Sequence, residues 1–173
     1  MRAFLQLLGA VTFVYILIVF VYDGIFFQSL MNNHLQDDIK GLKAQCVLEG
    51  VAFPEIAAAQ IIHETNWLSS DVYKEHNNCF GMTCHKWGTY CICEGNNRKD
   101  KDGMYCDYES TLFSIKDYAE WQQQRFRGYR KAKKPIPITR EEYLQFLIDV
   151  HYATDKRYIH KVEKYLDYTL TVH

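Results

Sequence analysis

An apolar helix with an acid near its C-terminal end is the feature that most constrains this chain. The segment begins at Pro54 and Glu55, and a proline followed by an acid is typical of a helix start, where the dipole is positive. Three alanines and two isoleucines follow, so the helix is apolar around most of its circumference and should be buried. His63 and Glu64 come near its end, just before Trp67. The sequence therefore predicts a buried helix that carries an acid into the interior.

The residues expected around Glu64 determine whether its carboxyl group is protonated near neutral pH. No cationic residue lies four positions earlier, because position 60 is Gln. A carboxylate packed against Ile61 and Trp67 would lose hydration, so its pKa would rise. A carboxylic acid that stays protonated near neutral pH can serve as a general acid. The plainer interpretation is a solvated glutamate at a helix end, and this pattern alone does not separate the two.

Composition limits the remaining possibilities. A length of 173 residues is enough for one domain with one core. The chain is 48% hydrophobic and 15% aromatic, which are values of a globular protein. Its formal net charge of −1 gives no reason to expect a nucleic-acid partner. Function has to be sought in particular segments.

The N-terminal segment predicts a membrane anchor. Ala3–Tyr22 contains no charged residue, and about 20 helical residues span the roughly 30 Å of a bilayer's hydrocarbon. The alternative is a cleaved signal peptide, but the run exceeds the typical apolar length and no small-x-small site follows it. Arg2 before the run and Asp23 after it place the N-terminus in the cytoplasm. We therefore expect a single-pass membrane protein.

The expected organisation has two parts. Residues 1–30 would be the transmembrane anchor and juxtamembrane stretch, held in the lipid bilayer. Residues 31–173 would be a periplasmic or extracellular domain.

Periodicity and capping residues predict the helices of that domain. The expected ranges are Leu35–Leu48, Ser110–Trp121, Thr139–His151 and Tyr158–Val172. A Thr139-x-x-Glu142 pattern opens the third of these as a capping box.

Between these helices, two alternating runs predict a small antiparallel hairpin. The runs are Thr89–Glu94 and Met104–Tyr108, with a hairpin turn expected at Asp102–Gly103. The basic run Arg125–Lys134 is expected to be a solvated loop. Its alternative is an electrostatic contact with an anionic polymer or lipid headgroups.

Four segments, taken together, resemble a known family. They are AAAQIIHETNWLSS, NNCFGM, YES and YATDKRY, in this order between Leu42 and the C-terminus. The sequence resembles the glucosaminidases of glycoside hydrolase family 73, peptidoglycan hydrolases found among autolysins, flagellar muralytic proteins and phage lysins. The resemblance implies a mainly α (α+β) lysozyme-like helical domain with a small β-hairpin lobe. It also implies an endo-β-N-acetylglucosaminidase that cuts the β-1,4 bond of the peptidoglycan strand without a cofactor or a metal.

By position in that family, Glu64 would be the general acid. A second carboxylate on the β-lobe is best matched by Glu94, with Asp107 and Glu109 as competitors. A distant base would activate water and invert the anomeric centre, whereas without one the substrate's N-acetyl group could assist. Tyr152 corresponds to a tyrosine of the family that faces the groove. The other residues expected to bind substrate in the groove are Asn78, Phe80, Trp67 and Tyr158. His63 departs from the small or apolar residue that commonly precedes the family's glutamate, and we interpret it as structural.

The six cysteines leave three possibilities open. A small β-lobe outside the cytoplasm gains stability from a disulfide, and Cys106 could bridge to Cys91 or to Cys93 across the hairpin. We expect at least one oxidised pair among Cys79, Cys84, Cys91, Cys93 and Cys106. Free buried thiols are a second possibility. A metal site is disfavoured, because Cys-x-Cys and Cys-His spacings match structural zinc poorly. Cys46, on a helix face, should belong to the core.

Three other functions remain to be weighed against the glucosaminidase. A lytic transglycosylase of the same fold would need only one catalytic glutamate and would leave a 1,6-anhydro product. A membrane-tethered module that binds the cell wall without turnover would not need a buried acid. A metal-stabilised interaction domain would depend on the cysteines.

Overall fold

The computed structural model describes residues 33–84, 89–93, 99–100 and 103–171. The chain divides into two compact units, Met1–Asp37 and Asp38–His173. Residues 33–37 of the first unit are helical, and the helix continues through residue 48 in the second. The predicted anchor Ala3–Tyr22 lies outside the described residues. No helix within the described ranges combines the length and apolarity needed to cross a bilayer.

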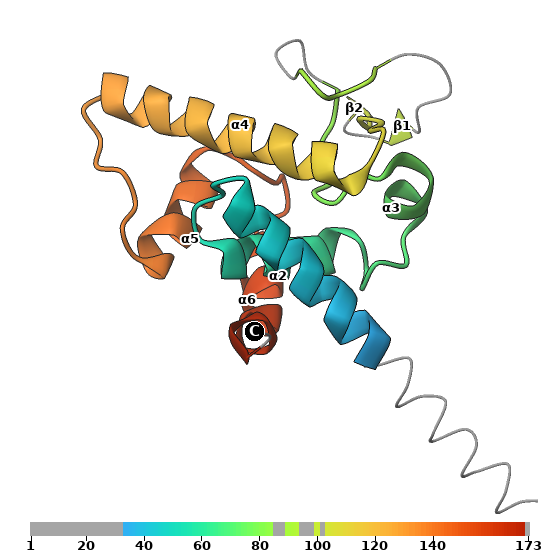
Figure 1. The fold of residues 1–173 in the computed structure, drawn as a ribbon. Helices are drawn as coiled ribbons and strands as arrows, with labels where there is room; N and C mark the ends of the chain where they lie inside the picture. Colours follow the sequence, from blue (N-terminus) through green and yellow to red (C-terminus); the bar gives the residue numbers. More distant parts are fainter. Residues whose placement is uncertain (1–32, 85–88, 94–98, 101–102, 172–173) are drawn as a thin grey trace, which may run out of the picture. The chain divides into compact units, whose positions relative to one another are not determined.

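The second unit is mainly helical. Its labelled helices are α2 (Pro54–Glu64), α3 (Asp71–His76), α4 (Thr111–Lys131), α5 (Arg140–Asp149) and α6 (Tyr158–Thr171) (Figure 1). Two short strands, β1 (Lys99–Asp100) and β2 (Gly103–Met104), pair antiparallel. The predicted mainly helical fold with little strand is thus confirmed.

Helix α2 is the centre of this unit. Its seven residues from Ile56 to Ile62 are buried, and α6 packs against it. Thr169 of α6 donates a hydrogen bond of 2.8 Å from Oγ1 to the backbone oxygen of Glu55. The C-terminal helix is therefore fixed to the start of the helix that carries the candidate acid.

Helix α2 stops at Glu64 because the chain turns sharply after it. Thr65 is fully buried, donates from Oγ1 to the carbonyl of Ile61 and accepts from the backbone N–H of Leu68. Asn66, Trp67 and Leu68 then adopt left-handed conformations with φ of 46°, 57° and 60°. Such backbone costs roughly 1–2 kcal/mol per non-glycine residue, so the turn is a strained structure that Thr65 helps to hold.

Ser70 caps α3 by accepting from the Tyr73 N–H. Two expectations about local structure are confirmed. Thr139 and Glu142 form the predicted capping box of α5. Cys46 is fully buried in the core.

Two expectations are corrected. The basic run Arg125–Lys134 is not a loop for most of its length, because α4 continues to Lys131. Its backbone stays helical since Phe126 and Tyr129 pack their rings against Phe146 of α5.

The hairpin is also displaced. Its first strand is β1, which lies between the two predicted runs and just before the turn expected at Asp102–Gly103. The described residues of the predicted run Thr89–Glu94 form an isolated bridge between Ile92 and Asp107. A second bridge joins Thr83 to Tyr105. The disulfide Cys91–Cys106 fastens this region, which confirms the expected oxidised pair.

Candidate active site

A cleft of about 610 Å³ opens beside the C-terminal end of α2. Five segments meet there. They are the end of α2, the loop after α3, the residue after β2, the middle of α4 and the stretch from Val150 to Tyr158. Its lining includes Glu64, Phe80, Gly81, Tyr105, Trp121, Arg125, Tyr152 and Tyr158. Aromatic rings on its walls and one acid at its base suit a sugar polymer.

The carboxyl group of Glu64 is largely enclosed, although the residue keeps some exposure to the cleft. Burial raises its pKa from 4.5 to about 7. A hydrogen bond from Tyr158 and the positive charge of Lys161 act in the opposite direction and lower this pKa in part. Desolvation dominates, so Glu64 is poised to hold and release a proton near neutral pH.

Gly81 lets the loop backbone approach this carboxyl group closely. A Cβ atom at this position would lie 2.9 Å from Oε2 of Glu64. The residue also has φ of +61°, a conformation that side chains disfavour. The segment NNCFGM contributes to the family resemblance, but it gave no indication that its glycine faces the acid.

Asn78 builds the loop that carries Gly81. Its side-chain amide donates to the carbonyls of Met82 and Cys106, at 2.9 and 3.0 Å, and its Oδ1 accepts from the Met82 N–H at 3.0 Å. Asn78 is 1% exposed and does not line the cleft. Its amide therefore holds the loop in shape, while the neighbouring residues Phe80 and Gly81 form the wall.

Tyr152 connects that loop to the opposite wall. Its hydroxyl donates to the carbonyl of Phe80 at 2.9 Å, and its ring lies 5.3 Å from that of Tyr158 and 5.1 Å from that of Trp121. Burial and the nearby Glu64 raise the pKa of Tyr152 well above its usual range. Tyr152 therefore stays neutral and fixes the shape of the cleft around the acid.

A line of buried hydrogen bonds leads from the opposite side of the core to this site. Oε1 of Gln122 accepts from the Ala52 N–H at 2.7 Å, which fixes the orientation of the Gln122 amide. Its Nε2 donates to the Tyr143 hydroxyl at 2.6 Å. The Tyr143 and Tyr118 hydroxyls lie 2.9 Å apart, and Tyr118 gives its own proton to Oε1 of Gln60 at 2.6 Å. Tyr143 must therefore be the donor to Tyr118, because each phenol has one proton.

The same line ends at the acid. Nε2 of Gln60 donates to the Tyr158 hydroxyl at 3.0 Å, and a hydrogen bond with Tyr158 lowers the pKa of Glu64. Every amide and hydroxyl along the way is buried. The direction of donation is fixed from Ala52 to the Tyr158 hydroxyl, so the core holds this hydroxyl in place beside Glu64.

Comparison with known proteins identifies the family. The family model described as glucosaminidase, mannosyl-glycoprotein endo-beta-N-acetylglucosaminidase, matches residues 44–169. This chain belongs to the glucosaminidase family. It is accordingly a glycoside hydrolase, as its resemblance implied.

A solved structure supports the fold of this glucosaminidase. The crystal structure of the catalytic domain of the autolysin Auto from Listeria monocytogenes aligns with a TM-score of 0.51 and 20% sequence identity. The alignment covers 80% of this chain and 84% of the Listeria domain. The two therefore share a fold. A search of curated proteins found no match.

Two residues expected to bind substrate in the groove of the glucosaminidase, Asn78 and Trp67, do not line the cleft. The ring of Trp67 packs edge-on against Tyr165 and Tyr168 of α6. The left-handed backbone after Glu64 places it there. Glu94, the predicted second carboxylate, lies outside the described residues.

Several cleft residues were not foreseen. Asp155 lines the cleft and forms an ion pair with Lys161, which keeps the pKa of Asp155 below its usual range. Trp121 and Arg125 reach the cleft from α4, where the guanidinium lies 5.7 Å from the indole centroid. His63 also lines the cleft, and burial lowers its pKa. Helical periodicity could indicate which side of α4 is buried, but not that this side forms the cleft wall.

Proposed function

We propose that this glucosaminidase is a peptidoglycan hydrolase of lysozyme-like fold that cuts the β-1,4 glycosidic bond, with Glu64 as general acid. The observation that carries the proposal is a carboxyl group with a pKa of about 7 at the base of an aromatic-lined cleft. Family membership adds the substrate class, a polymer containing β-linked N-acetylglucosamine. The Listeria neighbour is an autolysin, which favours the cell-wall polymer.

In the proposed reaction, Glu64 protonates the oxygen of the leaving sugar as the glycosidic bond breaks. Its raised pKa keeps it protonated up to about neutral pH. Once Glu64 is ionised, the Tyr158 hydroxyl donates to the carboxylate. Aromatic side chains of the cleft, including Tyr152 and Trp121, provide surfaces against which sugar rings can stack. We retain Glu94 as the proposed second carboxylate.

A lytic transglycosylase is the second candidate. The acids that line the described part of the cleft are Glu64 and Asp155, and Asp155 is held in an ion pair with Lys161. A single free acid is all that a transglycosylase needs. The two activities differ in their products, a reducing N-acetylglucosamine end for the hydrolase and a 1,6-anhydro end for the transglycosylase.

In the deciding experiment, the wild type and Glu64→Gln each digest purified peptidoglycan. Mass spectrometry identifies the products and measures the rate at which they form. Gln keeps the volume and polarity of Glu but cannot protonate the leaving oxygen. We expect a rate loss of at least about 10²-fold, since general acid catalysis supplies about 10²–10⁴-fold. The wild-type rate should fall on the alkaline side of about pH 7, as Glu64 loses its proton.

The matched control is Glu163→Gln on α6, which removes an exposed carboxylate and should leave the rate unchanged. A Glu64→Gln protein that keeps most of the wild-type rate would contradict the mechanism. Wall binding without any turnover by the wild type would instead identify a binding module.

We further propose that the enzyme is anchored in the membrane by residues 1–30, with its N-terminus in the cytoplasm. The uncharged run Ala3–Tyr22 supports this assignment. The catalytic unit would then face the cell wall on the periplasmic or extracellular side.

A further inference from the structure

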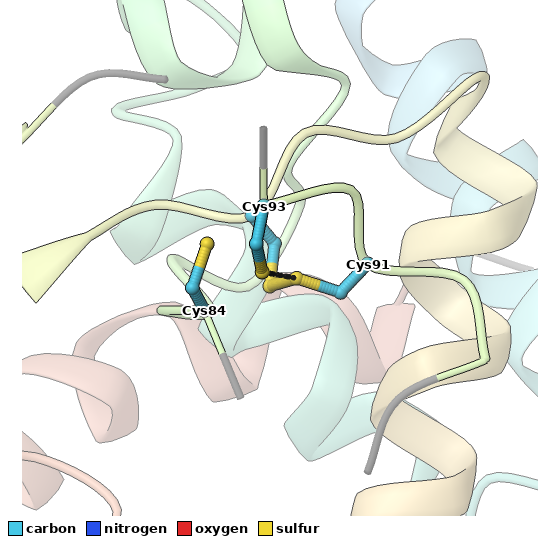
Figure 2. A group of neighbouring side chains, drawn as sticks. Cys84, Cys91 and Cys93 are labelled. Carbon is cyan, nitrogen blue, oxygen red and sulfur yellow. Dashed lines mark hydrogen bonds between the residues drawn. A yellow bond between two sulfur atoms is a disulfide. The ribbon is translucent and has the colours of Figure 1, made fainter. Parts of the chain in front are cut away.

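Four cysteines gather behind one wall of the cleft. The sulfur atoms of Cys84, Cys91, Cys93 and Cys106 all lie within 4.8 Å of one another. Cys106 is fully buried and the other three are partly buried. Figure 2 shows Cys91 and Cys93, which lie on one stretch of chain, meeting Cys84 from another. The fold thus assembles a group of four sulfur atoms, although the spacing of these residues along the sequence disfavoured a metal site.

The β-bridges explain this convergence. Cys84 follows Thr83, which pairs with Tyr105, and Cys106 follows Tyr105. Ile92, flanked by the other two cysteines, pairs with Asp107. Each bridge therefore brings cysteines on one segment next to Cys106 on the other.

The sulfur positions suit a tetrahedral metal centre. A zinc ion bound by four thiolates has Zn–S distances of about 2.3 Å, which places the sulfurs about 3.8 Å apart. The observed limit of 4.8 Å and the 3.1 Å between the sulfurs of Cys91 and Cys93 bracket that spacing. Only the pair Cys91–Cys106, which is joined as a disulfide, has to separate before all four sulfurs can act as ligands.

We propose that these four cysteines form a redox-dependent zinc site, in which the reduced cluster binds one Zn²⁺ and the Cys91–Cys106 disulfide is its oxidised form. A dithiol reductant transfers two electrons and two protons to the disulfide and itself becomes a disulfide, leaving four thiols. Zinc binding then displaces the four thiol protons into solvent and forms four Zn–S bonds. Four sulfur ligands in tetrahedral arrangement favour zinc over harder divalent ions.

The site would hold the cleft wall together. Thr83 and Tyr105 line the cleft, and each is followed directly by one of the cysteines. A metal at this position would join these two segments, as the disulfide joins Cys91 to Cys106. Its role is structural, because it lies behind the wall and does not line the cleft. The proposal does not depend on which glycosidic bond the enzyme cuts.

Metal titration of the full chain in detergent tests the site. The protein is reduced with a phosphine under exclusion of air, stripped with a chelator and titrated with Co²⁺. We expect one Co²⁺ per chain, with thiolate-to-cobalt charge-transfer absorption and the visible bands of a tetrahedral centre. Added Zn²⁺ should displace the cobalt and protect four cysteines from alkylation, which peptide mass spectrometry maps to the cluster.

Cysteine variants add a second readout. Cys84→Ser and Cys93→Ser should each weaken metal affinity by at least about tenfold, since even an outer-shell partner of a metal site is worth about 10–100-fold. Cys46→Ala removes a buried cysteine outside the cluster and should leave binding unchanged. Failure of the reduced wild type to bind either metal would overturn the proposal, as would unchanged affinity in both serine variants. The wild-type stoichiometry and alkylation map decide the question even where a variant does not fold.

Discussion

At the scale of single residues, burial of Glu64 makes its ionised form unfavourable, so ionisation of this group lowers the free energy of unfolding. Its pKa is about 7 in the folded protein, against an ordinary value of 4.5. The folded state therefore binds more protons than the unfolded state between these two values, so stability falls as pH rises through that window. The cost is absent below about pH 4.5 and fully present above about pH 7.

Replacing this carboxyl group should remove the cost. At pH 8 we expect Glu64→Gln to be more stable than the wild type by up to about 3 kcal/mol. At pH 4 the difference should vanish, because the wild-type group is then protonated in both states. Urea unfolding at the two pH values measures this, with Glu163→Gln as the surface control. A stability difference that does not change with pH would show that Glu64 is not held neutral by burial.

Gly81 offers a sharper test of the site's geometry. Gly81→Ala combines an unfavourable backbone conformation with a Cβ atom 2.9 Å from Oε2 of Glu64. Gly50→Ala is a close match, because Gly50 has φ of +71° with nothing within 4 Å of the added atom. Both variants should lose about 1–2 kcal/mol from left-handed backbone. Only Gly81→Ala should also lose activity, by more than about tenfold, because displacing a catalytic group by about 1 Å can cost up to 10²-fold.

Equal activity loss in the two glycine variants, measured as kcat on peptidoglycan, would contradict this assignment. The close approach of Gly81 to Glu64 could not have been predicted from the sequence. A turn with paired asparagines and a glycine is a local pattern, whereas the side chain it faces belongs to α2 and depends on how the loop packs.

At the scale of elements, the end of α2 determines where the acid lies. The Thr65 hydroxyl makes two of the hydrogen bonds that organise the left-handed turn. Thr65→Val has nearly the same shape but leaves the Leu68 N–H without its acceptor, so we expect a loss of about 1–3 kcal/mol. Thr65→Ser keeps the hydroxyl and should recover most of it. Thermal unfolding ranks the two variants, and equal stability of the valine and serine proteins would show that the hydroxyl does not hold the turn.

The helices and strands also show which parts of the fold can be predicted from sequence patterns. Helices with clear periodicity and caps, such as α5 with Thr139 and Glu142, were predicted within a few residues because their signals are local. The helical continuation of α4 through the basic run was missed, because it depends on contacts with Phe146 of α5. The hairpin was displaced for a similar reason. Pairing partners in a short β-lobe depend on bridges such as Ile92–Asp107, and alternation in the sequence does not specify them.

At the scale of the whole molecule, membrane anchoring is the remaining prediction. Since the apolar run lacks a cleavage site, we expect the mature protein to keep residues 1–30 and to sediment with membranes. N-terminal sequencing of the membrane fraction measures this, and a chain lacking residues 1–30 should appear in the supernatant. A released wild-type form that begins well after residue 22 would rule out the anchor.

The line of hydrogen bonds from Ala52 to Glu64 has a consequence for how this sequence can evolve. Its side-chain members are Gln122, Tyr143, Tyr118, Gln60 and Tyr158. Losing any one of them leaves a buried group without a partner, at a cost of about 1–3 kcal/mol, whereas replacing adjacent members together with apolar residues can be nearly neutral. Among descendants of this chain, these positions should therefore change in groups, and a lineage that loses one member should lose its neighbour soon afterwards.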